Sequence, residues 1–435
     1  MHHRVLIVGT VPYNKKSSSR AFDAYFHNWE KENIRQIFSN TKTPCKGHCS
    51  ELYQITDHRI LRRFLGHREE TGRIFYDKDL PEEWADNDLE VGQKAAKAYR
   101  LGAKHSSLTH LLRGFLWQKR FWCTEQLDRW LDDFKPECVF LAFSDDFFIP
   151  KIALYAAKRY RIPIVSCIGD DYYFNLHFSL NPFYWIYKLS YRRFIRRLFR
   201  HPGSAIYISD KIRDKYNEAF GLDGDTVYLT SEVVRREFQP VNTISPLITY
   251  FGNIRMGRNQ SLSKIADSLA EIDPAYRIEV YSNESDTAYS RILEENPHVL
   301  YGGSIPYSMV QKKMTDSDIT VIVEGFRKKD VDLSRYSLST KAADALASGC
   351  AILVYGSAEC GIVEYMQSTG AAMVCTKRDE LTGCIRELIG NDALRQAYYD
   401  RQIAVSNEHH TLIRSCETAE RIIDTAIMKG VENGR

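Results

Sequence analysis

The residues of this sequence best suited to binding an anion lie in a polar loop at the start of a short helix. The loop residues are Leu338, Ser339, Thr340 and Lys341, and Asp344 follows one helical turn later. Backbone amides at a helix N-terminus have no partners within the helix and point outward at the positive end of its dipole. We therefore expect a phosphate group over 338–341, with Asp344 accepting hydrogen bonds from neighbouring hydroxyl groups.

The residues around this loop predict a helix followed by a buried strand. Ser339 or Thr340 can cap a helix over 341–348, and Gly349 can end that helix in the left-handed conformation. The apolar run 351–355 has the length of a strand. Capped helices that end in glycine before a strand occur in any parallel α/β sheet, so this segment alone also fits a purely structural interpretation.

A second basic loop begins after an apolar strand at Ile248. The loop contains Gly252 and Arg258, and a helical pattern follows through Leu269. Ligands of open α/β sheets bind beyond the carboxyl ends of the strands, which is where this loop lies. A charge-assisted hydrogen bond to phosphate contributes about 1.5 to 3 kcal/mol, so loss of Arg258 would weaken binding measurably. The alternative is a solvated arginine in a loop.

Two pairs of adjacent acids follow predicted strands in the first half of the chain. Asp170 and Asp171 come directly after the strand 164–168, and Asp145 and Asp146 follow the strand before it. Adjacent carboxylates repel each other, and this cost is usually tolerated for function where a sheet edge faces a cleft. The alternative is a helix cap beside a surface residue, and the sequence does not separate the roles of the two pairs.

The length and patterning of the chain predict how these residues are positioned. A chain of 435 residues exceeds what one hydrophobic core usually supports, so two domains of about 200 residues each are expected. Short apolar runs alternate with helical patterns in both halves, which predicts an α/β fold with a doubly wound parallel sheet in each half. The polar stretch 240–246, bounded by prolines, is the predicted linker. We expect domains over 1–240 and 241–410, and a final helical segment over 411–435.

Composition argues against several classes of protein. The 59 basic and 56 acidic residues give a net charge of +3, which is too even for a dedicated nucleic-acid binder. Cys45 and Cys49 lack a second ligand pair at finger-like spacing, so no metal site is expected. Scattered free thiols imply a reducing, cytoplasmic location. No stretch approaches the 18 uncharged apolar residues that a membrane-spanning helix requires.

The loop and helix around Lys341 and Asp344 resemble the nucleotide-sugar-binding segment of retaining GT-B glycosyltransferases. This family is built from two Rossmann-like domains that face a cleft, and its last helix crosses back onto the first domain. The resemblance places Asp344 at the carboxylate that binds the ribose of the donor. It places Arg258, six positions after Gly252, at the basic residue that binds the donor pyrophosphate.

Other residues match the family pattern less closely. Asn253 stands where many members have arginine, so Arg255 is expected to assist Arg258. Glu324 is a candidate for the carboxylate that contacts the donor sugar, although Tyr336 stands where the family spacing places a glutamate. In the first half, the resemblance implies that Gly9 and the amides of 17–19 lie under the donor phosphates.

The resemblance thus implies two sets of site residues. One of Asp170 and Asp171 would orient the acceptor hydroxyl or the transferred sugar. The expected catalytic residues are Asp170, Asp171 and Arg258. The expected donor-binding residues are Gly9, Gly252, Asn253, Arg255, Arg258, Glu324, Leu338, Ser339, Thr340, Lys341 and Asp344.

The family also implies an activity. It suggests a hexosyltransferase that moves a sugar from a UDP- or GDP-sugar to the hydroxyl of a glycan, lipid-linked or other acceptor, in bacterial surface polysaccharide or glycoconjugate synthesis. Transfer would be retaining and would need no metal or other cofactor. Two alternatives stay open: a nucleotide-sugar 2-epimerase, and a non-catalytic membrane-associated scaffold with the same fold.

A basic amphipathic helix is predicted over 183–200. Aromatic and aliphatic residues occupy one side, and Arg192, Arg193, Arg196, Arg197 and Arg200 occupy the other. Such a helix is typical of a segment that lies in an anionic bilayer surface, which would make the protein peripheral on the inner face of the cell membrane. The alternative is a domain helix that packs its aromatic stripe inward.

Overall fold

The structure is a computed structural model that describes residues 2–12, 19–82, 107–146 and 148–433. The chain forms two compact units, of which the first comprises Met1–Val227 with Cys416–Arg435 and the second comprises Tyr228–Ser415. The division at Val227/Tyr228 precedes the boundary at residue 240 that the sequence predicts.

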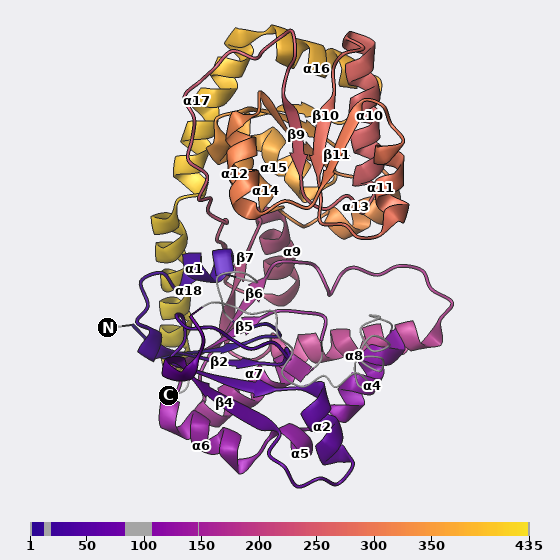
Figure 1. The fold of residues 1–435 in the computed structure, drawn as a ribbon. Helices are drawn as coiled ribbons and strands as arrows, with labels where there is room; N and C mark the ends of the chain where they lie inside the picture. The colour runs from indigo at the N-terminus through magenta and orange to yellow at the C-terminus, as the bar shows by residue number, and fades with distance from the viewer. Residues whose placement is uncertain (1, 13–18, 83–106, 147, 434–435) are drawn as a thin grey trace. The chain divides into compact units, whose positions relative to one another are not determined.

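The first unit is built on an eight-stranded sheet in the order β4-β3-β2-β1-β5-β6-β7-β8, with helices on both faces (Figure 1). All strand pairs are parallel except β3 with β4. Its strands are β1 (Val5–Val8), β2 (Ile34–Phe38), β3 (Glu51–Ile55), β4 (Gly72–Tyr76), β5 (Cys138–Ala142), β6 (Ile164–Ile168), β7 (Gly203–Tyr207) and β8 (Asp225–Thr226). Its helices are α1 (Ser19–Tyr25), α2 (Asp57–Phe64), α4 (Ser107–Leu116), α5 (Lys119–Trp122), α6 (Glu125–Phe134), α7 (Phe148–Tyr160), α8 (Pro182–Leu198) and α9 (Asp210–Phe220).

The second unit has a six-stranded, wholly parallel sheet in the order β11-β10-β9-β12-β13-β14. Its strands are β9 (Ile248–Phe251), β10 (Ile278–Tyr281), β11 (Val299–Gly303), β12 (Ile319–Val323), β13 (Ala351–Tyr355) and β14 (Met373–Cys375). Its helices are α10 (Arg258–Ile272), α11 (Thr287–Glu294), α12 (Tyr307–Asp316), α13 (Lys328–Ser334), α14 (Lys341–Ser348), α15 (Gly361–Thr369), α16 (Leu381–Gly390) and α17 (Asp392–His409).

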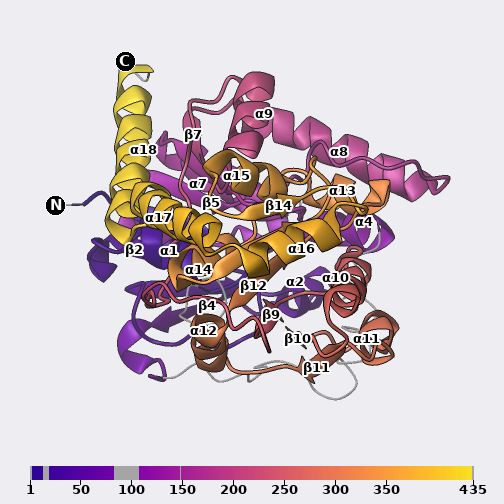
Figure 2. The same cartoon turned by 90° about the horizontal axis from the view of Figure 1, so that it is seen from above.

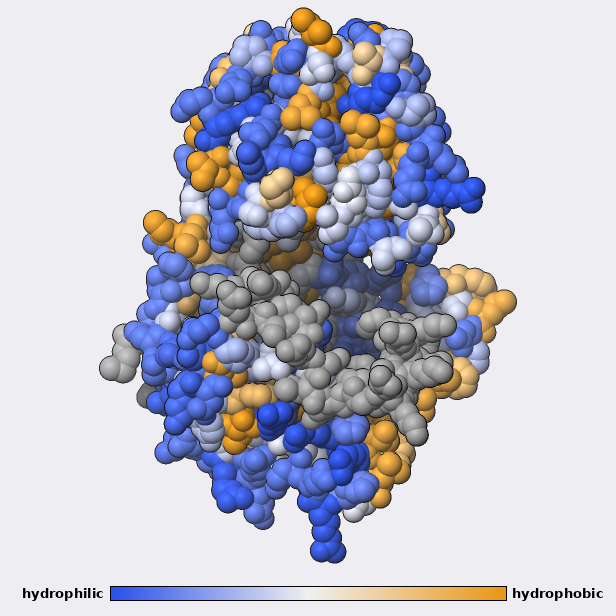
Figure 3. Space-filling model, viewed as in Figure 1, coloured by the Kyte–Doolittle hydropathy of each residue, from blue (hydrophilic) through white to orange (hydrophobic). Residues whose placement is uncertain are grey.

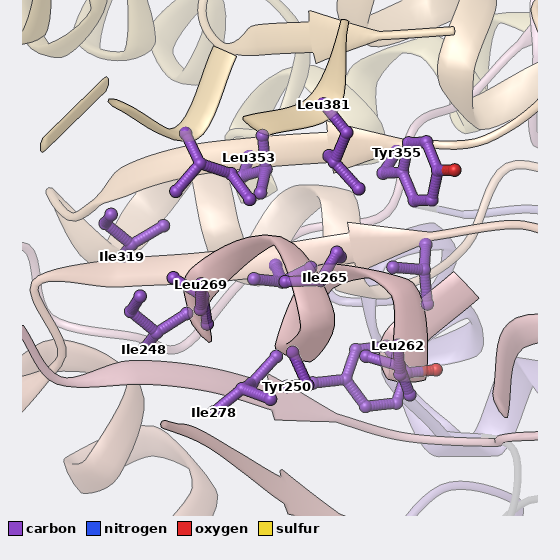
Figure 4. Close-up of a cluster of buried hydrophobic side chains, with 14 of the residues drawn as sticks. Ile248, Tyr250, Leu262, Ile265, Leu269, Ile278, Ile319, Leu353, Tyr355 and Leu381 are labelled. Carbon is purple, nitrogen blue, oxygen red and sulfur yellow. The ribbon is translucent and has the colours of Figure 1, made fainter. Parts of the chain in front are cut away.

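Both faces of the second sheet are buried, which explains why its strands read as continuous apolar runs. On one face, Leu262, Ile265 and Leu269 of α10 pack against Ile248 and Tyr250 of β9 (Figure 4). The opposite face forms a separate cluster in which α14 packs on β12 and β13. The predicted doubly wound fold is confirmed.

The final helix, α18 (Leu412–Asn433), packs its inner face into the core of the first unit. The side chains concerned are Ala419, Ile422, Ile423 and Ala426. Figure 2 shows this helix running up to the C-terminal end of the chain. All ten cysteines are free thiols. Within the described ranges, no helix is both long and apolar enough to cross a membrane.

Helix α8 packs its aromatic stripe inward. Tyr184, Tyr187, Tyr191, Ile195 and Leu198 are buried. The hydroxyl of Tyr187 donates to the Asp145 carbonyl at 2.9 Å, and that of Tyr191 donates to the Ser144 carbonyl at 2.8 Å. The expectation that this stripe enters a bilayer is therefore wrong, because these side chains belong to the core of the first unit.

Candidate functional site

The candidate site lies in the second unit, where the order of its strands reverses. β9 comes first along the chain and lies in the middle of the sheet. The chain adds β10 and β11 on one side of β9, and then β12, β13 and β14 on its other side. Adjacent connections at such a point leave in opposite directions, so the carboxyl ends of β9 and β12 border a crevice where ligands of this fold bind. The segments that follow these strands are 252–257 and 324–327.

The loop after β9 has an unusual backbone. Gly252, Met256 and Gly257 have φ angles of 133°, 57° and 75°. The left-handed region disfavours side chains, so a non-glycine residue such as Met256 is held there by its surroundings. Gly325, after β12, fits against this loop so closely that a Cβ atom there would lie 2.3 Å from the Met256 carbonyl oxygen. The two loops therefore position each other.

Arg258 and Glu324 form a bidentate ion pair across this edge of the sheet. The Arg258 Nη2 and Nε atoms donate to Glu324 Oε1 and Oε2 at 2.8 and 3.1 Å. Both side chains are buried, with 9% and 3% of the residue surface exposed. Burial acts to lower the pKa of the Arg258 guanidinium, but the adjacent Glu324 carboxylate outweighs this effect and raises it. The charged pair is thus fixed at the point predicted for a donor phosphate.

The side chain of Lys341 extends from the first turn of α14 toward the Arg258–Glu324 ion pair. Its ammonium donates to the Tyr250 hydroxyl at 2.8 Å and lies 4.5 Å from the centre of that ring. A Cβ atom at Gly252 would lie 2.1 Å from Lys341 Cε, so a side chain there would displace the end of the Lys341 side chain from this position. Burial and the nearby Arg258 cation together lower the pKa of Lys341 to about 7.

Asp344 lies one turn further along α14 and is buried. Its Oδ1 accepts a hydrogen bond from the Ser231 hydroxyl at 2.7 Å. The Tyr307 hydroxyl lies 3.3 and 3.4 Å from its two oxygens. The carboxylate is therefore already surrounded by hydroxyl donors, which is the environment that a ribose would supply.

The predicted helix 341–348 and strand 351–355 match α14 and β13 at both ends. Gly349 ends the helix with a φ of 79°, as expected. Of the two predicted caps, the side chain of Thr340 makes no capping hydrogen bond. Ser339 Oγ accepts from the Lys341 amide at 3.3 Å, and Leu338 is buried in the core cluster under α14.

Asn253 and Arg255 have contacts within their own part of the loop. The Asn253 Oδ1 accepts from the Arg255 amide at 2.7 Å. The Arg255 Nη2 donates to Glu284 Oε1 at 2.8 Å, and the guanidinium lies 5.1 Å from the centre of the Tyr289 ring. The structure thus brings Arg258, Glu324 and Lys341 together, whereas Arg255 pairs with a different acid.

The predicted residues of the first unit also lie at the carboxyl ends of strands. Gly9 follows β1, and its amide donates to the Ile37 carbonyl at 3.0 Å. A Cβ atom at Gly9 would lie 3.1 Å from Ala142 Cβ, at the end of the adjacent β5. Of the predicted amides at 17–19, residues 17 and 18 lie outside the described part of the chain.

Asp170 and Asp171 differ in environment. Asp171 Oδ1 accepts from the Phe174 amide and the Tyr216 hydroxyl, both at 2.8 Å, and from the Tyr173 amide at 3.1 Å. Burial raises the pKa of the Asp171 carboxyl, although these hydrogen bonds act against the rise. Asp171 thus holds the turn after β6, and Asp170 beside it is exposed.

Asp145 and Asp146 lie beside a histidine and an arginine of α4. His110 Nε2 is 3.6 Å from Asp145, and its Nδ1 is 3.7 Å from Asp146. Arg113 Nη1 donates to Asp146 Oδ1 at 2.9 Å. Among the residues that the structure describes, no group of three His, Cys, Asp or Glu side chains is arranged to hold a metal ion.

Three residues of the second-unit site were not singled out from the sequence. Tyr250 reads as one more apolar residue of a strand, and Ser231 and Tyr307 lie far from Asp344 along the chain. Only strand alternation gave a signal: Tyr250 is two residues before Gly252, on the face of β9 that carries the core residue Ile248. Its hydroxyl takes part in the site because it donates to the Asn253 carbonyl in the loop after β9 and accepts from Lys341.

Comparison with known proteins identifies the fold. No family model and no curated protein matches the sequence. Among solved structures, Anabaena HepE with UDP gives a TM-score of 0.57 at 10% identity, covering 97% of this chain and 100% of that one. An E. coli trehalose-6-phosphate protein bound with UDP-2-fluoro glucose gives 0.59 at 10% identity, covering 97% and 99%. A glycosyltransferase from Rickettsia africae gives 0.53 at 10% identity, covering each chain completely. The chain has the GT-B fold.

Proposed function

We propose that this protein is a glycosyltransferase that transfers a hexose from a UDP-sugar to an acceptor hydroxyl. The observation that supports the proposal most strongly is the meeting of Arg258, Glu324 and Lys341 where the sheet of the second unit reverses its order. Two cationic side chains and one carboxylate at a nucleotide-binding edge fit a diphosphate with a sugar attached. UDP is the first nucleotide to test, because the HepE and E. coli structures hold UDP or a UDP-sugar.

In this proposal, Arg258 and Lys341 bind the donor diphosphate. The Arg258 pair with Glu324 uses Nε and Nη2, which leaves Nη1 for a phosphate oxygen. An anion beside Lys341 would favour the protonated ammonium, so binding would raise the pKa of Lys341 from its value of about 7. Negative charge grows on the diphosphate as the glycosidic bond breaks, and fixed cations at that place lower the barrier.

Asp344 would bind the ribose of the donor. Its buried carboxylate accepts from Ser231 and Tyr307, and the Tyr307 contacts are long enough for a ribose hydroxyl to replace them. Glu324 would hold Arg258 in place and accept from a hydroxyl of the transferred sugar. We further propose, from the family resemblance, that transfer retains the anomeric configuration and needs no metal. Cytoplasmic synthesis of a bacterial surface polysaccharide or glycoconjugate is the setting that this implies.

The proposal is tested by a donor screen with detection of products by mass spectrometry. Purified protein is incubated with UDP- and GDP-sugars, with and without a cell extract as a source of acceptor. We expect release of UDP together with a product heavier by one hexose, and loss of both in Arg258→Ala. An epimerised nucleotide sugar without acceptor would indicate a 2-epimerase. Nucleotide binding without turnover of any donor would contradict the transferase proposal.

A further inference from the structure

The outer face of α8 carries two different chemistries along its length. In its first half the exposed side chains are apolar: Phe183, Trp185, Ile186 and Leu189. In its second half they are basic, namely Arg193, Arg196 and Arg197, and the exposed Arg200 follows just after the helix ends. The buried face is already filled by tyrosines of the first-unit core. The outer face therefore has a separate role from the stripe that the sequence suggested.

The loop that leads into α8 extends the apolar half. Phe178 and Leu180 are 85% and 87% exposed, which is unusual for large apolar side chains. Figures 1 and 2 both show this loop running out beside α8 before it turns back into the first helical turn. In Figure 3, hydrophobic side chains gather at the right-hand edge of the view, where Figure 1 places the loop and the start of α8.

The basic half of α8 borders a pocket of about 360 Å³. Its lining includes Arg192, Arg196 and Arg200, spaced by one helical turn, together with Tyr173 and Phe220. Arg196 Nε donates to the Tyr173 hydroxyl at 2.7 Å, and Arg192 lies 4.7 Å from the centre of the Tyr173 ring.

The charge of the five arginines within 192–200 is a further feature of this surface. Within the described part of the chain, none of the five arginines of 192–200 forms an ion pair, and the buried Arg192 Nε has no hydrogen-bond partner. Arginine prefers bidentate contact with carboxylate or phosphate groups. These guanidinium groups surround a pocket and have no carboxylate partner among the described residues. We therefore expect the pocket to bind an external anion.

The two halves together point to one partner. Protruding aromatic and aliphatic side chains enter the acyl region of a bilayer, while adjacent arginines bind lipid phosphates at the same depth as the headgroups. An acidic protein would pair with the arginines. Its acidic groups would not cover the exposed apolar side chains of Phe178 and Leu180. We propose that the first unit docks onto an anionic membrane through the α8 platform, defined as residues 176–200, with a lipid phosphate in the arginine pocket.

The test is co-sedimentation of the full-length protein with vesicles. The vesicles contain either phosphatidylcholine alone or phosphatidylcholine with about a third phosphatidylglycerol. We expect binding to the anionic vesicles only, and a loss of about tenfold or more when salt rises from about 0.1 M to about 0.5 M. Equal binding to both vesicles, or none to either, would overturn the proposal.

Paired variants separate the two halves. Phe178→Ser with Leu180→Ser removes the apolar tip, and Arg193→Glu with Arg197→Glu reverses the basic rim. Each pair is expected to lower the fraction bound to anionic vesicles by about tenfold or more. Arg192→Gln, in the pocket, is expected to reduce the preference for phosphatidylglycerol over phosphatidylcholine. Sedimentation that is unchanged in both paired variants would contradict the platform.

Matched controls distinguish the platform from general effects. Val234→Ser with Ile244→Ser removes apolar side chains that are 83% and 85% exposed in the second unit. Arg129→Glu with Arg291→Glu makes the same change in net charge at exposed positions elsewhere. Both controls are expected to sediment like the original protein.

Two further measurements complete the test. Each platform variant is expected to bind UDP unchanged, which separates this proposal from the donor site, and to keep the circular dichroism spectrum and melting curve of the original protein, which shows that the first unit is folded. Brominated lipids are expected to quench Trp185 fluorescence, and Trp185→Phe to remove that quenching. Binding of inorganic phosphate by the soluble protein, without any binding to vesicles, would assign the pocket to a free anion and overturn the bilayer as its occupant.

Discussion

Lys341 links the stability of the second unit to the proposed binding of a diphosphate. Its ammonium is held beside the Arg258 cation and donates to the Tyr250 hydroxyl. The pKa falls from 10.5 to about 7, so the folded state binds a proton here less tightly than the unfolded chain does. This residue therefore opposes folding below the unfolded pKa, and a nearby anion would relieve that cost.

The pH dependence of UDP binding follows from this pKa. Between about pH 7 and pH 9 the free protein loses the Lys341 proton, whereas bound diphosphate restores it. We expect UDP affinity to fall as pH rises through this range, by up to about tenfold per pH unit, with uptake of a proton on binding. Titration calorimetry in two buffers of different ionisation enthalpy measures that uptake. Binding that is independent of pH would contradict the role of Lys341.

Replacing Lys341 by methionine separates binding from stability. Lys341→Met removes a charge that is costly to bury, so the free energy of unfolding at pH 7 is expected to rise by about 1 kcal/mol or more. The same variant is expected to lose UDP affinity and its dependence on pH. Chemical denaturation and calorimetry measure the two effects. A variant that is less stable and binds UDP normally would show that Lys341 is a structural residue only.

The residues of the site were predictable to different degrees. Arg258, Lys341 and Asp344 could be found because their spacing from glycines and from the end of a helix is fixed along the chain. Glu324 was also a candidate, but its pairing with Arg258 could not be found. Tyr250 and Ser231 were missed, because these partners meet the site residues only through the packing of strands and loops. Arg255 could be predicted as a basic residue of the loop after β9, but its pairing with Glu284 could not.

At the scale of elements, the site depends on the close fit of the loops after β9 and β12. A Cβ atom at Gly325 would lie 2.3 Å from the Met256 carbonyl oxygen and 2.8 Å from Asp330 Cβ. The backbone of 252–257 would have to move to admit it, and Arg258 follows directly in the chain. The position of the cation is thus set by a glycine in another loop.

Gly325→Ala tests this fit. We expect UDP affinity to fall by about tenfold or more, because a displacement of about 1 Å is large compared with the tolerance of a hydrogen-bonded site. The melting temperature is expected to fall as well. The control is Gly383→Ala in α16, where nothing lies within 4 Å and helix propensity predicts a gain of about 0.5 to 1 kcal/mol. Normal UDP binding by Gly325→Ala would contradict the proposed dependence.

Elements were predictable where capping and periodicity agree. The bounds of α14 and β13 follow from a polar loop, a glycine stop and an apolar run. Periodicity does not separate the short helices α4, α5 and α6 from one longer helix, because the turns between them carry no strong breaking signal. For α8, periodicity gave the aromatic stripe, but only the structure shows that this stripe is buried.

At the scale of the whole molecule, each unit has its own hydrophobic core, and the donor residues Arg258, Lys341 and Asp344 all belong to the second unit. Ligand binding should therefore protect that unit. With UDP at about 100 times its dissociation constant, mass action stabilises the bound fold by about 2.7 kcal/mol. Hydrogen exchange of the full chain is expected to slow most over 252–258 and 338–345. No change within 228–415 would contradict the placement of the site.

The central claim is that a sugar diphosphate binds between the loop after β9 and the start of α14. Titration calorimetry of UDP and GDP with the full-length protein, Arg258→Ala and Asp344→Ala tests it most directly, with Arg291→Ala, whose side chain is 77% exposed, as the control. We expect UDP to bind the original protein and the control, with affinity about tenfold or more lower in each site variant. Undiminished binding of UDP in both Arg258→Ala and Asp344→Ala would contradict the claim.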